Sequence, residues 1–551
     1  MNDNTIRSRW LAGTPLRPLL ITITLALALL LSAAYHAAFA EVIWVEAGLV
    51  GDKLINGQYE YEEVTFITGK PIHLKGTVKL SAPPKGKNKY TQSYSFELSN
   101  EAEKIALKRD VAFEVVLTPN EALGQTVQKR TLTKYAESIT TPEGTFTLGK
   151  YNYLESRVTD NTPAVSYQSG NLLLEKTLYL DGDARKNSGS VSFVIDVKPI
   201  VGYEHRYGEQ ESRVVRQEIR STRPSDKGDR VWTGIVDIGL SSLKKTFFEY
   251  QYTDPQNISF RGSYFKQLMD ENVVTYTYDL YRPEAATGAG VGTATGVGAS
   301  AAGASGPGTG ATGAATAGSQ PLDTSKRNQG TKRMSNRVPS GQEALVIPRI
   351  RDIAGLPAER AITLLTAMQA FDVGKEFYAP HTPIHRHEFA KALSIVIAGE
   401  LPEPTRTEIT RRLRPGVDTP YLDVLPADPD YHYIERYKKL GLVSGKNRYL
   451  KPDELLTRAE MVVMTIRALG IEHIAPNPPY DTIYLDTKKI PNWAKDAIYM
   501  GTEIGLVRGT DGYFHPHATV LREEAAQILY DLIRHLNDTI TPDYREKLLN
   551  R

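Results

Sequence analysis

Alternating apolar and polar residues run through residues 41–283 and predict β-strands. Two clear cases are Tyr94–Leu98 and Val273–Tyr281, and turn signals such as Asn56-Gly57 and Asp181-Gly182-Asp183 separate the runs. A period of two places one face of each strand in a core and the other face in water. We therefore expect an antiparallel all-β region with sandwich-like packing, as one or two sandwiches.

The alternation stops at residue 284, where the composition changes. Thr287–Gly318 consists almost entirely of Gly, Ala, Thr and Ser, and a basic run from Lys326 to Arg337 follows. Such a tract has too few large apolar side chains for a core, so residues 284–342 are predicted to be a flexible linker that displays the β region. We interpret the basic run as solvated linker, with weak attraction to an anionic wall polymer as the alternative.

A helical period replaces the two-residue period in the last part of the chain. Trp493, Ala497 and Met500 are spaced to line one face of a helix, and a second stripe runs from Ala525 to Leu536. Neither helix buries its stripe alone, so several such pairs are expected to pack together. Comparison of the region with itself gives three copies: a degenerate repeat 1 at 343–400, repeat 2 at 419–472 and repeat 3 at 482–537.

The repeats share an ordered set of landmarks. Asp423 and Asp486 lie near the start of repeats 2 and 3, glycines follow the first helix, and a loop with a proline comes next. Glycine just past a helix supplies the left-handed conformation that other residues resist. Six residues after each proline stands an arginine, and the three are Arg386, Arg458 and Arg522.

Arg458 lies where the second helix of its repeat is predicted to begin. Thr457 and Glu460 have the spacing of a capping box, which places Arg458 in the first turn. A cation there opposes the helix dipole, so stability alone would not select it. Because a guanidinium suits carboxylate recognition, the recurrence favours ligand binding, with a bond to a neighbouring carboxylate as the alternative.

Residues 1–40 have the pattern of a secretory signal peptide. Arginines precede an apolar run at Leu19–Leu31, and Ala38-Phe39-Ala40 offers small residues for cleavage. The run is shorter than the roughly 20 residues that span a bilayer, so cleavage after Ala40 is favoured over an uncleaved anchor. After cleavage we expect no membrane association.

Composition removes several classes of function. The chain has 551 residues, a net charge of +2 and no cysteine, which argues against nucleic-acid binding and excludes disulfides and Cys-ligated metals. Residues 41–283 contain only His73 and His205, with neither a His-Glu-x-x-His nor a Gly-x-Ser-x-Gly motif. The histidines near the arginines lack metal-ligand spacing. We expect no catalytic residue, metal or cofactor, although a glycoside hydrolase needs only two of the many carboxylates.

The landmarks resemble the S-layer homology family over about residues 345–537. Repeat 3 has the tryptophan–alanine pair, the paired glycines, the aromatic-x-proline and the arginine-x-glutamate of the family, with Leu521 in place of its threonine. Repeat 2 keeps Thr457–Glu460 but has Leu450 at the aromatic position and no tryptophan. Repeat 1 departs most, with His385-Arg386-His387-Glu388.

This resemblance implies an all-α pseudo-threefold bundle whose inter-repeat grooves bind secondary cell-wall polysaccharide, a peptidoglycan-linked glycan, typically through pyruvate-ketal sugars. Trp493 would be either a platform for a sugar ring or plain core. The remaining roles that it implies are carboxylate binding by Arg386, Arg458 and Arg522, loop shaping by Gly445 and Gly509, orientation of neighbours or hydroxyl binding by Asp423 and Asp486, and helix capping by Thr457, Glu460, Glu388 and Glu524.

Together these patterns predict a secreted, non-enzymatic surface protein that is anchored to the cell wall and displays a structural or adhesive β region. Whether it also self-associates in an S-layer lattice is left open by the sequence. One alternative is a wall-anchored, polysaccharide-active enzyme with its active site in the β region. Another is an outer-membrane tether with a β-barrel, against which the density of charge along the strands argues.

Overall fold

The structure is a computed structural model of the whole chain. The signal-peptide prediction for residues 1–40 and most of the predicted linker lie outside the residues that it describes. The described residues are 46, 48–54, 57–81, 87–223, 230–251, 263–282, 327–414, 419–443 and 448–549.

The first part of the described chain is a single antiparallel sheet in which each strand pairs with the next one along the sequence. The predicted all-β region is thus confirmed, but the strands form one sheet rather than one or two sandwiches. The strands are β1 (Leu49–Lys53), β2 (Gln58–Thr65), β3 (Ile72–Leu80), β4 (Lys89–Asn100), β5 (Ile105–Asn120), β6 (Gln125–Thr141), β7 (Gly144–Asn161), β8 (Val165–Leu180), β9 (Gly189–His205), β10 (Gly208–Arg223), β11 (Arg230–Gln251), β12 (Ser263–Arg282) and β13 (Asn328–Leu345).

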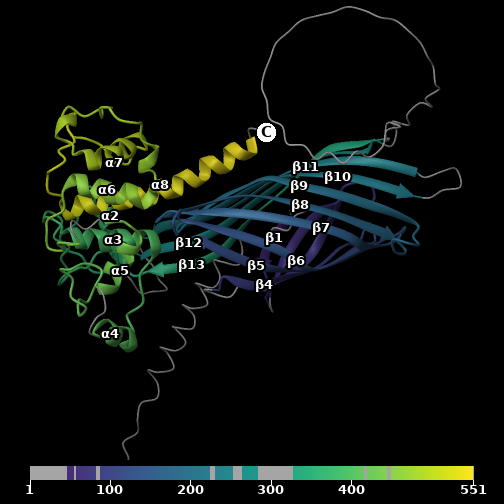
Figure 1. Ribbon diagram of the computed structural model, residues 1–551, viewed down its shortest axis with the longest axis horizontal. Helices are drawn as coiled ribbons and strands as arrows, with labels where there is room; N and C mark the ends of the chain where they lie inside the picture. The colour runs from purple at the N-terminus through teal and green to yellow at the C-terminus, as the bar shows by residue number, and fades with distance from the viewer. Residues whose placement is uncertain are drawn as a thin grey trace, which may run out of the picture.

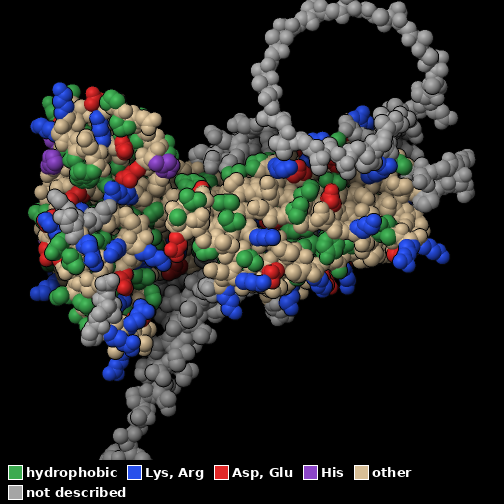
Figure 2. Space-filling model, in the orientation of Figure 1, with side chains coloured by type: hydrophobic (Ala, Val, Ile, Leu, Met, Phe, Trp, Pro, Cys, Tyr) green, Lys and Arg blue, Asp and Glu red, His purple; other side chains and the backbone are tan. Residues whose placement is uncertain are grey.

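The sheet curls until its two edge strands meet, as Figure 1 shows. The Asn336 side chain on β13 donates a hydrogen bond of 2.6 Å to the Val50 carbonyl on β1. Curling turns one face of every strand inward, where apolar residues such as Phe96, Phe113 and Ile195 are fully buried. Lys and Arg side chains are scattered over the outer surface (Figure 2).

β13 corrects the predicted linker boundary. Its residues pair with β12 from Tyr264↔Leu345 to Leu280↔Asn328, so positions 328–342 belong to the sheet and not to a linker. The alternation signal failed here because Met334 is the only side chain of β13 that is buried. Backbone hydrogen bonds to β12 hold the strand, and these leave no apolar pattern in the sequence.

Charged side chains also lie inside the curled sheet, and they are paired. Arg109 lies 2.9 Å from Glu63 and 3.1 Å from Glu137, and Lys176 lies 2.9 Å from Glu137. Burial by itself would raise the pKa of Glu137, but the two cations outweigh it and lower that pKa to about 2. Removing one partner of such a network leaves an uncompensated buried charge, which is strongly destabilising.

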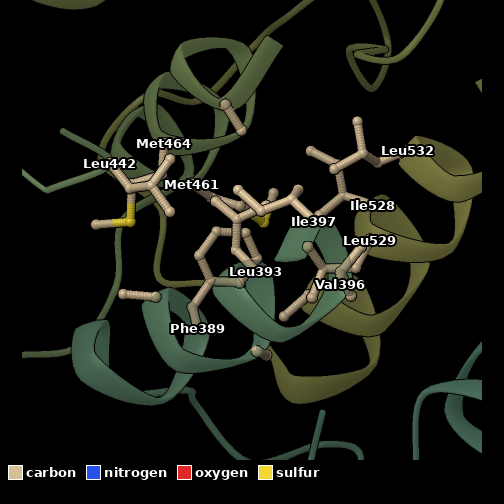
Figure 3. Packing of buried hydrophobic residues seen from close by; sticks show 14 of the residues in the cluster. Phe389, Leu393, Val396, Ile397, Leu442, Met461, Met464, Ile528, Leu529 and Leu532 are labelled. Carbon is tan, nitrogen blue, oxygen red and sulfur yellow. The ribbon is translucent and has the colours of Figure 1, made fainter. Parts of the chain in front are cut away.

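The second part of the described chain is helical, as predicted. The second helices of the three repeats, α3, α6 and α8, pack through Phe389, Leu393, Met461 and Leu529 into one core (Figure 3). No helix among the described residues is both long and apolar enough to cross a bilayer. The helices are α2 (Glu359–Ala367), α3 (Arg386–Ala398), α4 (Arg406–Arg412), α5 (Tyr431–Lys439), α6 (Arg458–Leu469), α7 (Asn492–Glu503) and α8 (Arg522–Leu549), with short 3₁₀ turns η3 (Glu472–Ile474) and η4 (Thr487–Lys489).

The helices are gathered at one end of the sheet and pack directly against it (Figure 1). The Tyr207 hydroxyl donates 2.6 Å to the Val396 carbonyl near the end of α3, and the Ala164 amide donates 2.8 Å to Ala468 near the end of α6. Tyr203 donates 3.0 Å to Thr539 of α8. The sheet therefore supplies hydrogen-bond donors to all three second helices, including carbonyls that helix ends leave unpaired.

Replacing Tyr207 with phenylalanine should destabilise the protein by about 1 kcal/mol, because the Val396 carbonyl loses the shorter of its two side-chain hydrogen bonds. Urea unfolding of the full chain measures the effect. Tyr151→Phe is the matched control, since Tyr151 is exposed on β7. Equal stability of the two variants would contradict the role assigned to the Tyr207 hydroxyl.

Candidate functional site

The three repeats meet in a closed ring of backbone hydrogen bonds. Ile384, Leu456 and Val520 lie just before the second helices, one in each repeat. The Ile384 amide donates 3.0 Å to Val520, the Val520 amide donates 3.0 Å to Leu456, and the Leu456 amide donates 3.0 Å to Ile384. Each residue is both donor and acceptor, so the ring closes with three members and fixes the threefold arrangement.

An aspartate holds the proline loop of every repeat in the same way. Both carboxylate oxygens accept backbone N–H groups, at the residue two positions before the proline and at the residue directly before it. Asp352 accepts from Tyr378 at 2.9 Å and Ala379 at 2.7 Å, Asp423 from Leu450 at 2.8 Å and Lys451 at 2.6 Å, and Asp486 from Phe514 at 2.8 Å and His515 at 2.9 Å. Repeat 1 thus has the same local structure as the other two, although its sequence departs most.

The three arginines form a second ring, outside the backbone ring. Each lies at the start of a second helix and pairs with the glutamate of the next repeat. Arg386 lies 3.5 Å from Glu460, Arg458 lies 3.8 Å from Glu524, and Arg522 pairs closely with Glu388. The alternative of a bond to a neighbouring carboxylate is therefore part of the geometry, and each arginine remains partly exposed.

The glutamates of this ring differ in their capping role. Thr457 and Glu460 form the predicted capping box in full, with contacts of 3.0 Å and 3.4 Å between side chains and backbone amides. Glu524 makes half of a box, because it accepts from the Leu521 amide at 2.8 Å and Leu521 has no hydroxyl to return. Glu388 pairs with Arg522, and His385 gives no side-chain cap to α3.

An open groove lies between repeats 2 and 3. It has a volume of about 570 Å³ and lies along α6, the segment Ile504–Arg508 and α8. Its polar lining includes Arg458, Arg508, Glu524, Gln527, Asp531, Arg534 and Asp538. A concave site with several convergent polar groups is the usual form of a ligand site. No pattern in the sequence singled out Arg508, Asp531 or Asp538.

Two glycines and the tryptophan were predicted as part of the site. Gly445 lies outside the described residues. Gly509 has no room for a side chain, because a Cβ would lie 2.6 Å from the Tyr484 ring. Trp493 is 54% exposed at the start of α7, so it is not core, and it does not line the groove between repeats 2 and 3.

Three further exposed aromatic residues were missed. Phe377, Tyr449 and Tyr513 are 52%, 46% and 41% exposed and stand directly before the buried Tyr378, Leu450 and Phe514. The recurrence of an aromatic residue at the same position of all three repeats could have identified them from the sequence. Aromatic surfaces held at fixed positions on a loop suit stacking against flat apolar faces, including those of sugar rings.

Repeats 1 and 2 are also linked by charge. His387 of α3 lies 3.0 Å from Asp430, which precedes α5, and Lys391 lies 2.9 Å from the same carboxylate. The hydrogen bond from His387, together with Lys391 and against the effect of burial, lowers the pKa of Asp430 to about 2.

Asn in place of Asp352 should cost about 1.5–3 kcal/mol, because a charged acceptor of two amides becomes a neutral one with a single oxygen. Asp486→Asn should lower the stability by a similar amount if repeats 1 and 3 have the same local structure. Thermal unfolding measures both variants. Asp453→Asn, at an exposed position of the repeat 2 loop, is the control. If Asp352→Asn left the thermal stability unchanged, repeats 1 and 3 would not be equivalent.

Acid should weaken the contact between repeats 1 and 2. A carboxylate whose pKa is lowered in the folded state stabilises fully above its unfolded pKa of about 4 and loses this as the pH falls toward 2, here about 2 kcal/mol. The unfolding free energy of Asp430→Asn, measured from neutral to acid pH, should therefore fall less steeply than that of the parent. Parallel curves for the two proteins would count against the assignment.

Comparison with known proteins identifies two of the repeats. The model of the S-layer homology domain matches residues 420–462 and 483–526. An endoglucanase of Bacillus sp. (strain KSM-635) is 31% identical over 142 residues, which is 23% of this chain and 15% of that enzyme. The exoglucanase XynX of Acetivibrio thermocellus is 29% identical over 125 residues, or 21% of this chain and 11% of that protein.

An amylopullulanase of Thermoanaerobacterium thermosulfurigenes is 29% identical over 120 residues, which cover 20% of this chain and 6% of the enzyme. The chain therefore spans only a small part of the length of these relatives. The matched segments contain the landmarks in the expected order. They also contain the repeated aspartate and arginine geometry described above. The C-terminal part of this chain contains two S-layer homology domains, at residues 420–462 and 483–526, and the protein is a cell-surface protein anchored at the cell wall.

Proposed function

We propose that the three repeats hold the protein on the wall by binding acidic secondary polysaccharide, through the carboxylate of pyruvate-ketal sugars. The observation that carries this proposal is the groove between repeats 2 and 3, which has Arg458 in its wall at the first turn of α6. A helix N-terminus and a guanidinium both favour an anion, and they converge here.

We count repeat 1 as a third S-layer homology unit, although the family model matches only the other two. Its Asp352 makes the same two backbone contacts as Asp486. Its Arg386 continues the arginine–glutamate ring, and its Ile384 is one of the three members of the backbone ring. A bundle that lacked this unit would leave both rings open.

For the curled sheet we propose a structural or adhesive role rather than catalysis. Its buried carboxylates Glu63, Glu137, Glu155 and Glu211 are all engaged with arginine or lysine side chains. Carboxylates held in this way balance buried charge. The polysaccharide-active alternative is tested by incubating the protein with wall polymer and measuring reducing sugar, where release would overturn the non-enzymatic role.

The wall-binding proposal is tested by co-sedimentation of the chain from residue 41 onward with purified walls that carry pyruvylated polymer. The same walls stripped of secondary polysaccharide serve as the comparison. We expect binding to need the polymer, and Arg458→Ala/Arg522→Ala to weaken it at least about tenfold, as expected for loss of a charged hydrogen bond.

Arg411→Ser in the exposed part of α4 is the control for a lost surface cation. The chain from residue 41 onward is used, rather than the repeats alone, because the sheet contacts all three second helices. Equal sedimentation with stripped walls would mean that the repeats bind something else.

A further inference from the structure

The three arginines of the ring are not equally available to a ligand. Arg522 uses its whole guanidinium within the protein: Nε donates 2.9 Å to the Tyr378 carbonyl, Nη2 donates 3.2 Å to Asp372, and Nη1 pairs with Glu388. Its plane also lies over the Tyr378 ring, 4.6 Å from the ring centre. Each of its three nitrogens is thus already engaged within the protein, which leaves Arg522 fewer donors for a ligand.

Arg458 is bound less completely. Nη2 donates 2.6 Å to the Arg508 carbonyl, but Nη1 lies 3.8 Å from Glu524, beyond hydrogen-bond distance. Its Nε is buried and has no hydrogen-bond partner among the described residues. The side chain is 22% exposed, against 14% for Arg522, and it lines the groove between repeats 2 and 3. Because the buried Nε does not reach the groove, the donor capacity that Arg458 retains there lies at Nη1.

The residue whose carbonyl accepts from each arginine changes in charge between repeats. Arg508 holds this position in repeat 3 and Asp372 holds it in repeat 1, both six residues before the buried aromatic residue of the loop. In repeat 2 the corresponding residue of the sequence is Ser444. This register places Val373 opposite Gly509.

Charge at this position should decide where an acidic group binds. In the groove between repeats 2 and 3, the Arg508 side chain stands beside Arg458 as a second cation. At the junction of repeats 3 and 1 the corresponding residue is Asp372, whose backbone carbonyl accepts from Arg522. Its exposed carboxylate lies 3.4 Å from Lys391 and adds a negative charge that opposes a bound anion there. Glu524 is the acidic group at the arginine end of the first groove, whereas Asp531 and Asp538 lie farther along α8.

We infer that the acidic group of the ligand binds in the groove between repeats 2 and 3, that Arg508 is the residue that sets this preference, and that Arg522 only ties repeat 3 to repeat 1. The inference rests on the proposed function, since it names the groove and the residue through which that function acts. Asp531, Asp538 and Gln527 are left to bind sugar hydroxyls along the rest of the groove.

The test titrates the full chain with the pyruvate ketal of methyl glucoside and with its neutral methyl ester, by calorimetry. The charged ketal should bind and the ester should bind at least about tenfold more weakly, because the ester lacks the negative charge that pairs with the guanidinium. Arg508→Ser, which installs the repeat 2 residue, should weaken the ketal about tenfold and leave the ester unchanged. Arg508→Asp should abolish the preference for the ketal.

Single changes in the ring then separate the inference from the proposed function. Arg458→Ala should lose ketal binding while the protein stays folded, whereas Arg522→Lys should lower the melting temperature and keep the ketal affinity of the folded protein. Lost affinity in Arg522→Lys, together with normal binding by Arg508→Ser and Arg458→Ala, would overturn the groove assignment while leaving an acidic-glycan function in place. Equal affinity of the parent for ketal and ester would overturn both.

Discussion

The closed ring of backbone hydrogen bonds among Ile384, Leu456 and Val520 is the constraint on which the helical part depends. It uses main-chain groups only, so it tolerates the sequence divergence between the repeats. The ring fixes the start of each second helix at one end of the bundle, and this brings each arginine against the glutamate of the next repeat. A ring of this kind closes only when all three units are present, which explains why repeat 1 keeps its structure while losing much of its sequence pattern.

The second helices carry this arrangement from the ring to the sheet. Their N-termini, where helix dipoles favour anions, lie at the arginine ring, and their later turns meet donors from the sheet. Arg206 adds a cation beside the Ile395 and Val396 carbonyls near the end of α3. The C-terminal end of α3 is therefore occupied by a group of suitable charge. The arginine ring lies at the starts of the second helices and the sheet contacts their later turns. If the grooves bind the wall as proposed, the bundle would direct the sheet away from it.

Sequence patterns predicted what depends on local rules. The capping box at Thr457 and Glu460 and the stripe of α8 follow from spacing, and both are present. The pattern failed at β13, because a strand held by its backbone partner needs no apolar face. It also failed to separate Arg458 from Arg522, which occupy the same place in their motifs. Their difference arises from Glu524, Glu388 and Asp372, groups in neighbouring repeats that no spacing within one repeat reveals.

The glycine- and alanine-rich tract has a different place in the molecule from a hinge between two domains. It joins β12 to β13, so the chain enters and leaves it at the end of the sheet that is remote from the helices. A protease that cut the tract would divide the polypeptide into β1–β12 and a piece consisting of β13 with the helices. The two pieces would still share the β12–β13 ladder and the contacts of the sheet with α3, α6 and α8. A nicked molecule would thus stay whole on the cell surface, as a two-chain complex without a covalent link.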